Sequence, residues 1–221
     1  MGSLEERTGR VMGKQAWRWI VLIALWVAAS GCFRGGAQDA RIDYYIPEYE
    51  SPVVQGLERL DVVIRLERFS VAPPYNTSRI VFSQNAYERD TYNYHRWRAN
   101  PADLVAYFLA RDFRESGLFQ AVLPHDSRFS ASCVLEGAVD EFFERDGPEI
   151  WEAVLAVSIT LMADQEPDVS RRVLFQEAYR EEEVCIRKNP RALTEAMSRA
   201  MERLSRRILV DVHRVLDQGT E

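Results

Sequence analysis

The chain has 221 residues, of which 47% are hydrophobic and 11% aromatic, so it can bury a sizeable core and is not an intrinsically disordered protein. It carries 34 acidic and 28 basic residues, a net charge of −6 at neutral pH. This acidic balance opposes binding to the phosphate backbone of nucleic acids.

The N-terminal stretch predicts a secretory signal peptide. The uncharged apolar run Trp19–Ala29 follows Lys14 and Arg18, and it is shorter than the roughly 20 residues that a bilayer-spanning helix needs. The small residues that end the run stand directly before Cys32, which resembles the lipobox of bacterial lipoproteins. In a lipobox the chain is cut before the cysteine and the cysteine thiol is acylated. We therefore expect residues 1–31 to be removed and Cys32 to become the lipidated first residue.

Two alternatives concern this N-terminal stretch. The apolar run could instead be an uncleaved anchor helix or a buried helix. Met12 is a second candidate for the true start, because the segment before it carries two glutamates, which are atypical of a signal peptide. Initiation at Met12 would leave a signal peptide of ordinary length.

Cleavage before Cys32 divides the rest of the chain into a lipidated tether (32–42), one domain (43–217) and a short tail (218–221). The ten residues after the cysteine reach at most ~35 Å, so the domain would work close to its membrane. In enterobacterial lipoproteins an aspartate after the acylated cysteine usually retains the protein in the inner membrane. Phe33 at this position favours the periplasmic face of the outer membrane.

The first half of the domain reads as strands followed by one helix. An extended segment is expected at 43–47, and alternating apolar residues predict a strand over 60–69. Two further strands are expected at 79–83 and 91–97. Asn100-Pro101 then starts an amphipathic helix that runs to about Ser116.

The second half reads as three long strands and one long helix. The strands are expected from Cys133 to Phe143, over 151–161 and over 173–179, with Phe143 on the same face as Cys133. Short turns between them predict an antiparallel meander. Apolar residues at intervals of three and four then predict an amphipathic helix from Pro190 to Leu216. The expected fold class is α+β, an antiparallel-rich mixed sheet with two amphipathic helices packed on one face.

The two cysteines of the domain are expected to be unpaired and buried. Cys133 begins one long strand, and Cys185 lies past the end of the strand two places later in the meander. Strands two places apart in a meander run parallel, so the two thiols should sit at opposite ends of the sheet. That separation exceeds the ~7 Å limit between bridged Cα atoms.

No pattern in the chain indicates catalysis. The three histidines, His95, His125 and His213, have no partner at metal-ligand spacing and accompany no nucleophile motif. The acidic run Glu181–Glu183 could bind a cation, but a solvated strand end is the preferred interpretation. We therefore expect a protein that is not an enzyme, with no catalytic residue, no metal ligand and no cofactor.

One cluster in the second hairpin is unusual in composition. It interleaves aromatic residues with arginines, residue types that are enriched at protein interfaces: Tyr87, Tyr92, Tyr94, Trp97, Arg89, Arg96 and Arg98. Alternate rings could pack in the core, or the cluster could form a surface for a partner. The sequence leaves both open.

The order of these features resembles a known family. A lipobox and a Tyr44–Ile46 segment are followed by a strand, a proline-rich turn, the stretch RIVFSQNAYERDTYNYHRW, a helix opened by Pro101, a meander and a C-terminal helix. This is similar to the ABC-type transport auxiliary lipoproteins, and the resemblance covers roughly residues 43–217. The chain departs from the family in Tyr45-Ile46-Pro47, where a Thr-Leu pair is commoner, and in its acidic loops.

The resemblance implies a docking or assembly component of an intermembrane transport system for lipids or hydrophobic compounds. The implied partners are a periplasmic MCE-domain protein and an ABC permease with its ATPase. A homo-oligomer would match the symmetry of a multimeric MCE channel. A periplasmic lipid- or solute-binding module is the alternative, and a periplasmic hydrolase is a third interpretation that lacks a nucleophile and base.

Acylation of Cys32 can be tested directly. Cells fed labelled palmitate are expected to incorporate label into the protein, and Cys32→Ala should abolish both the label and cleavage of the precursor, because no other thiol stands at the lipobox. Unchanged processing and membrane fractionation of Cys32→Ala would contradict the lipoprotein assignment.

Overall fold

The fold is described here from a computed structural model, in which residues 41–219 are described. The predicted signal peptide, Cys32 and the tether as far as residue 40 lie outside these residues. The described elements, in chain order, are β1 (Asp43–Tyr45), β2 (Leu60–Leu66), β3 (Ser70–Val71), the 3-10 helix η2 (Pro73–Tyr75), β4 (Arg79–Ser83), β5 (Asp90–Trp97), α2 (Pro101–Glu115), β6 (Phe119–Leu123), β7 (Cys133–Asp146), β8 (Trp151–Ala163), α3 (Val169–Arg172), β9 (Val173–Val184) and α4 (Pro190–Gln218).

The long strand β7 organises the sheet. Along one edge it pairs in parallel with three short strands in succession: β2 at Cys133–Leu135, β3 at Ala138 and Val139, and β4 at Glu144 and Arg145. Its other edge pairs with β8 over its whole length in antiparallel register. The remaining strands are added outward, since β6 pairs with β2, β5 with β4, and β1 with β5.

The predicted meander of three long strands is confirmed by the antiparallel pairs β7–β8 and β8–β9.

The two cysteines of the domain lie at opposite ends of the meander. Cys133 pairs with Ala163 at one end of β8, whereas the Cys185 amide donates to the Trp151 carbonyl at the other end (2.7 Å). Both thiols are buried and unpaired, as expected. Burial raises the pKa of each thiol to about 12, so both stay protonated.

The expected α+β class with helices on a mixed sheet is confirmed, but the description antiparallel-rich is partly wrong. Five strand pairings among the described residues are parallel and three are antiparallel. The meander is antiparallel because short turns join its strands. The short strands come from distant parts of the chain, so no turn constrains their direction. Strand β6, which the sequence pattern did not predict, also pairs in parallel, with β2.

Phe143 lies on the opposite sheet face from the one predicted. The register of β7 and β8 shifts between Val139 and Glu141, which is a β-bulge. A bulge inserts one residue and reverses the alternation beyond it. Phe142 therefore continues the face of Val139, and Phe143 stacks instead on the Tyr75 ring, 5.7 Å between centroids.

The two amphipathic helices form where they were predicted. The Asn100 side chain accepts a hydrogen bond from the Ala102 amide at the start of α2, and the Asn189 side chain accepts from the Ala192 amide at the start of α4. Each helix has a proline in its first turn, where the missing N–H costs little. The predicted apolar stripe of α4 is buried at Leu193, Ala196, Met197, Ala200, Met201, Leu204, Ile208 and Val212.

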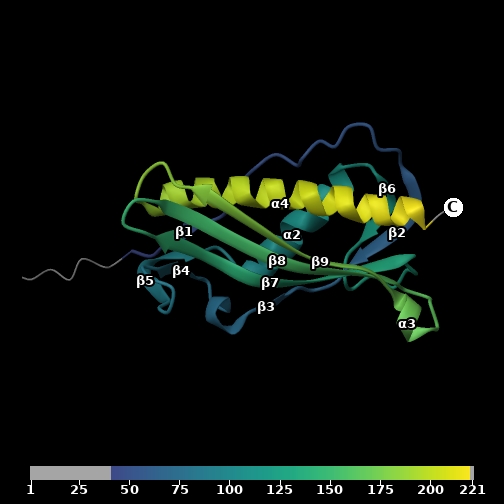
Figure 1. Ribbon diagram of the computed structural model, residues 1–221, viewed down its shortest axis with the longest axis horizontal. Helices are drawn as coiled ribbons and strands as arrows, with labels where there is room; N and C mark the ends of the chain where they lie inside the picture. The colour runs from purple at the N-terminus through teal and green to yellow at the C-terminus, as the bar shows by residue number, and fades with distance from the viewer. Residues whose placement is uncertain (1–40, 220–221) are drawn as a thin grey trace, which may run out of the picture. The chain divides into compact units, whose positions relative to one another are not determined.

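Figure 1 shows α4 running along β8 and β9, with α2 beside it. Both helices pack on the sheet face that carries Leu135, Val139 and Phe142, all fully buried. Two arginines of α4 also reach the free edge of β9: Arg199 donates to the Val184 carbonyl (2.9 Å) and Arg207 to the Arg180 carbonyl (3.5 Å). Such contacts occupy hydrogen-bonding groups that an edge strand leaves open. None of the helices in the described residues is both long and apolar enough to cross a bilayer.

Candidate functional site

The three histidines lie far apart and each has a structural contact. His213 donates from Nε2 to the Glu58 carbonyl (2.7 Å), and the His125 Nε2 accepts from Arg68 Nε (2.8 Å). The Nδ1 atom of His95 lies 3.2 Å from the Tyr45 hydroxyl. Within residues 41–219 no three histidine, cysteine or acidic side chains are grouped as a metal site. The absence of a metal, a cofactor and a catalytic residue stays a prediction.

The acidic run Glu181–Glu183 is held by arginines. Glu181 pairs with Arg207 on α4 (2.5 Å), and Glu183 pairs with Arg199 on the same helix (3.2 Å). Glu182 points to the opposite face of the sheet, where it meets Arg145 (2.9 Å). Because strand alternation sends neighbouring side chains to opposite faces, the three carboxylates do not converge on one point.

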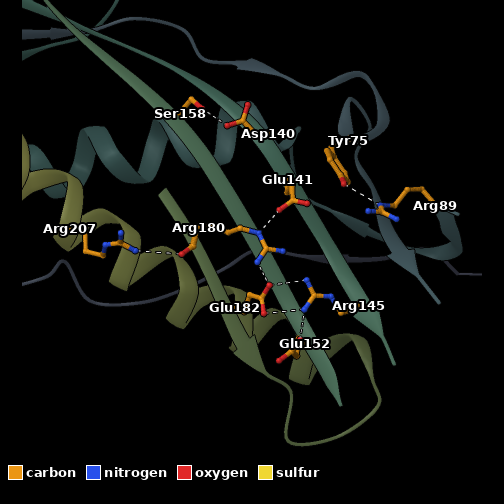
Figure 2. A network of polar contacts seen from close by, with 10 residues as sticks. All are labelled: Tyr75, Arg89, Asp140, Glu141, Arg145, Glu152, Ser158, Arg180, Glu182 and Arg207. Carbon is orange, nitrogen blue, oxygen red and sulfur yellow. Dashed lines mark hydrogen bonds and ion pairs between the residues drawn. The ribbon is translucent and has the colours of Figure 1, made fainter. Parts of the chain in front are cut away.

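A charged ladder crosses the face of the meander opposite to the helices (Figure 2). Glu141 pairs with Arg180 (2.7 Å), Arg180 with Glu182, and Glu182 with Arg145. Arg145 also contacts Glu152 (2.8 Å), so the ladder joins all three strands. The hydrogen bond from Arg145 is the main cause that lowers the pKa of Glu182 to about 2. The ladder therefore consists of paired charges, and its three carboxylates and two guanidinium groups give it a net charge of −1.

A buried carboxylate, Asp112, fastens the segment that follows the tether. Its side chain is fully buried and accepts hydrogen bonds from the hydroxyls of Tyr49 and Ser51 (both 2.8 Å) and of Ser205 on α4 (2.6 Å). Arg111 pairs with it at 2.7 Å. We call these five residues the Asp112 clasp. The clasp joins residues 49–51 to both helices, so a pull on the tether would act on the folded body as a whole.

Sequence reasoning missed Asp112, although one signal was present. Val105, Phe108 and Leu109 lie on the buried stripe of α2, and Asp112 occupies the next position of that same stripe. A charged residue in an apolar stripe indicates a buried partner, because an uncompensated buried charge is very costly.

A groove of about 770 Å³ lies between the segment after β1 and the first half of α4. The Glu48 amide donates to Ser198 Oγ (2.9 Å) beside it, which holds the two walls together. Half of the twelve residues that line the groove are charged: Glu48, Glu50, Arg191, Glu195, Arg199 and Glu202. The groove is open to solvent and bordered by these charged side chains, whereas an acyl-chain site encloses most of its ligand.

A second buried carboxyl, Glu144, lies near the β7–β8 turn. It is 1% exposed and accepts hydrogen bonds from the Tyr92 hydroxyl (2.9 Å) and from the Trp151 indole. Burial raises the pKa of Glu144 from 4.5 to about 7, although the two hydrogen bonds act in the opposite direction. The group therefore changes charge close to neutral pH.

The aromatic–arginine hairpin fits both interpretations that the sequence left open, because some of its rings pack in the core and others lie on the surface. Trp97 is fully buried and packs edge-on against Phe142, 5.2 Å between centroids. Tyr92 is half-buried on Glu144, whereas Tyr87 and Tyr94 are 96% and 52% exposed. The cluster therefore contributes both to the core and to the surface.

The chain belongs to the ABC-type transport auxiliary lipoprotein component family, because the model of that family matches residues 44–209. The resemblance seen in the sequence is thereby confirmed. The match begins at Tyr44, directly after the predicted tether.

Solved structures share the fold. Protein XCC0632 from Xanthomonas campestris, described as a member of the DUF330 family, has a TM-score of 0.73 at 15% identity, covering 80% of this chain and 98% of that one. A second, uncharacterized protein has a TM-score of 0.58 at 11% identity over 78% and 99% of the two chains. At these identities the likeness concerns the fold alone. No curated protein matches the sequence.

Removal of the Asp112 carboxylate is expected to destabilise the domain strongly. Asp112→Ala leaves Arg111, the buried Ser205 hydroxyl and the partly buried Tyr49 hydroxyl without this acceptor, which should lower the free energy of unfolding by about 3 kcal/mol. Urea denaturation measures the change. Asp217→Ala, on the exposed side of α4, is the control and should change stability by less than about 0.5 kcal/mol. Equal effects of the two substitutions would contradict the clasp.

Glu144 is expected to make stability depend on pH. Its pKa is higher in the folded protein than in the unfolded chain, so folding favours the protonated form. This contribution is fully present below about pH 4.5 and is lost as the pH rises towards 7, by on the order of 3 kcal/mol.

Glu144→Gln keeps an acceptor oxygen for Tyr92 and Trp151 and cannot ionise, so it should flatten this part of the stability profile. Urea denaturation at a series of pH values between 4 and 8 measures the free energy of unfolding as a function of pH. The exposed Glu136→Gln should leave the profile of the parent chain unchanged. A profile that Glu144→Gln does not alter would show that this carboxyl is not the titrating group.

Proposed function

We propose that this protein is a non-enzymatic docking component of an ABC/MCE-type system that moves lipids or hydrophobic compounds between two membranes. In this proposal the acyl chains on Cys32 hold the domain at the periplasmic face of the outer membrane. The domain then binds a periplasmic MCE-domain protein, which works with an ABC permease and its ATPase.

The match of residues 44–209 to a family of ABC-transport auxiliary lipoproteins carries this proposal. The family domain starts where the tether ends, and the Asp112 clasp couples that start to both helices. A short tether supports docking, because it would confine the partner-binding surface to a thin layer next to the membrane and raise its effective concentration there. The structural contacts of the three histidines support a role without catalysis.

The alternative is a periplasmic lipid- or solute-binding module. The charged lining of the groove between the β1 segment and α4 favours docking over this alternative. An open groove bordered by charged side chains suits contact with a protein surface more than it suits enclosure of acyl chains.

Co-purification from membranes tests the proposal. Tagged protein extracted in mild detergent is expected to bring with it an MCE-domain protein together with ABC permease or ATPase subunits, identified by mass spectrometry. Cys32→Ala should reduce this recovery, because the unanchored domain loses its high local concentration. Recovery of phospholipid without an MCE protein would instead favour the binding module, and recovery of neither would remove the support for docking.

A further inference from the structure

Three arginines and one tyrosine lie together on the strands next to the tether. Tyr44 of β1 pairs in register with Arg96 of β5, and Arg96 pairs with Arg79 of β4. Residues in direct register share a face of the sheet. The Arg98 guanidinium lies 5.4 Å from the centre of the Tyr44 ring. We call Tyr44, Arg79, Arg96 and Arg98 the anchor-side patch.

Acidic side chains lie near the anchor-side patch, since Tyr44 shares the groove described above with Glu48 and Glu50, but they form no ion pair with its arginines. No ion pair joins Arg79, Arg96 or Arg98 to an acidic side chain within residues 41–219, whereas arginines of α4 such as Arg199 and Arg207 do pair with glutamates. Like charges in direct register, as at Arg79 and Arg96, destabilise a sheet. The patch therefore has the charge of a surface that binds an anion.

An unsatisfied donor lies within the patch. The Arg96 Nε atom is buried and has no hydrogen-bond partner among the described residues. A phosphate that approaches from solvent does not reach this buried atom, so the patch would bind it through other guanidinium nitrogens. Guanidinium groups are well suited to phosphate, because their planar array of donors can bind two of its oxygens at once.

The position of the anchor-side patch indicates which anion lies close to it. Only residues 33–43 separate Tyr44 from Cys32, so the acylated cysteine keeps the patch within ~40 Å of the bilayer surface. Tyr44 is 53% exposed, and tyrosine rings favour the boundary between headgroups and water. The neighbouring acid Asp43 alternates to the other face of β1, where His95 lies 4.0 Å away. It therefore does not shield the patch from an approaching anion.

We propose that the anchor-side patch binds the phosphates of anionic phospholipids in the membrane that holds the protein. This inference rests on the lipid anchor of the proposed function and adds a second contact with the bilayer. A basic residue near an anionic membrane strengthens binding about fivefold, which is little for a free domain but sufficient for one already tethered to the surface. The two contacts together fix which side of the domain faces the membrane and which side faces the periplasm.

The test uses the acylated chain, reconstituted in vesicles, with Tyr44→Trp as a fluorescent reporter. The domain's other tryptophans, Trp97 and Trp151, are 1% and 6% exposed and give a background that the parent chain measures. Vesicles contain brominated phosphatidylcholine, which quenches fluorescence at the bilayer, with or without phosphatidylglycerol. We expect the reporter to be quenched more strongly when phosphatidylglycerol is present, and high salt to reverse this difference.

Substitutions distinguish the patch from a general charge effect. Arg98→Gln should lower the ratio of docked to undocked protein about fivefold, and the triple variant Arg79→Gln/Arg96→Gln/Arg98→Gln should abolish the dependence on phosphatidylglycerol. The matched control Arg114→Gln/Arg128→Gln/Arg187→Gln removes the same charge from three exposed arginines elsewhere and should dock like the parent. Circular dichroism checks that each variant is folded.

Three outcomes would overturn the inference: equal quenching with and without phosphatidylglycerol, equal loss in the patch and control variants, or a change at the reporter only when a co-purified MCE-domain protein is added. The last outcome would assign the patch to a protein partner. All arms keep the acylated Cys32, so a negative result leaves the anchor and the co-purification test untouched.

Discussion

The pairing of the long strand β7 along both of its edges is the constraint on which the rest of the structure depends. A fourteen-residue strand exposes many amide and carbonyl groups, and buried groups of this kind must be paired. One edge is satisfied by a single strand of matching length, β8. The other edge is satisfied in sections by β2, β3 and β4, which brings the whole N-terminal half of the domain onto β7.

This arrangement gives the meander two faces with different properties. One face is apolar and lies under α2 and α4, with side chains such as Leu135 and Val157 fully buried. The other carries the ladder of Glu141, Arg145 and Glu182 with its partners, in which both arginines are paired with carboxylates. A face whose arginines are already paired has little free positive charge with which to bind an anionic partner. The anchor-side patch differs because its arginines have no such partners among the described residues.

The clasp and the patch lie on the same short stretch of chain. Tyr44 contributes to the patch, and Tyr49 and Ser51 contribute to the clasp, all within nine residues of the tether's predicted end. The clasp makes this stretch part of the folded body, because its carboxylate bridges to both helices. In the proposed docking role, the clasp would transmit a pull from the anchored end of the chain to both helices.

The amino-acid sequence by itself determined the family, the two amphipathic helices, the long meander and the unpaired state of Cys133 and Cys185, while the lipobox at Cys32 stays a prediction. These features are local, because an apolar stripe or a strand alternation reports burial within one segment. Only the tertiary structure decided that β2, β3 and β4 run parallel to β7, that the bulge turns Phe143 to the other face, and that Asp112 and Glu144 are buried with their partners. The anchor-side patch also emerges only in three dimensions, since register brings Tyr44, Arg79 and Arg96 together. The physical reason is that backbone pairing and buried polar contacts join segments far apart in the chain, and the periodicity of one segment carries no information about its partner.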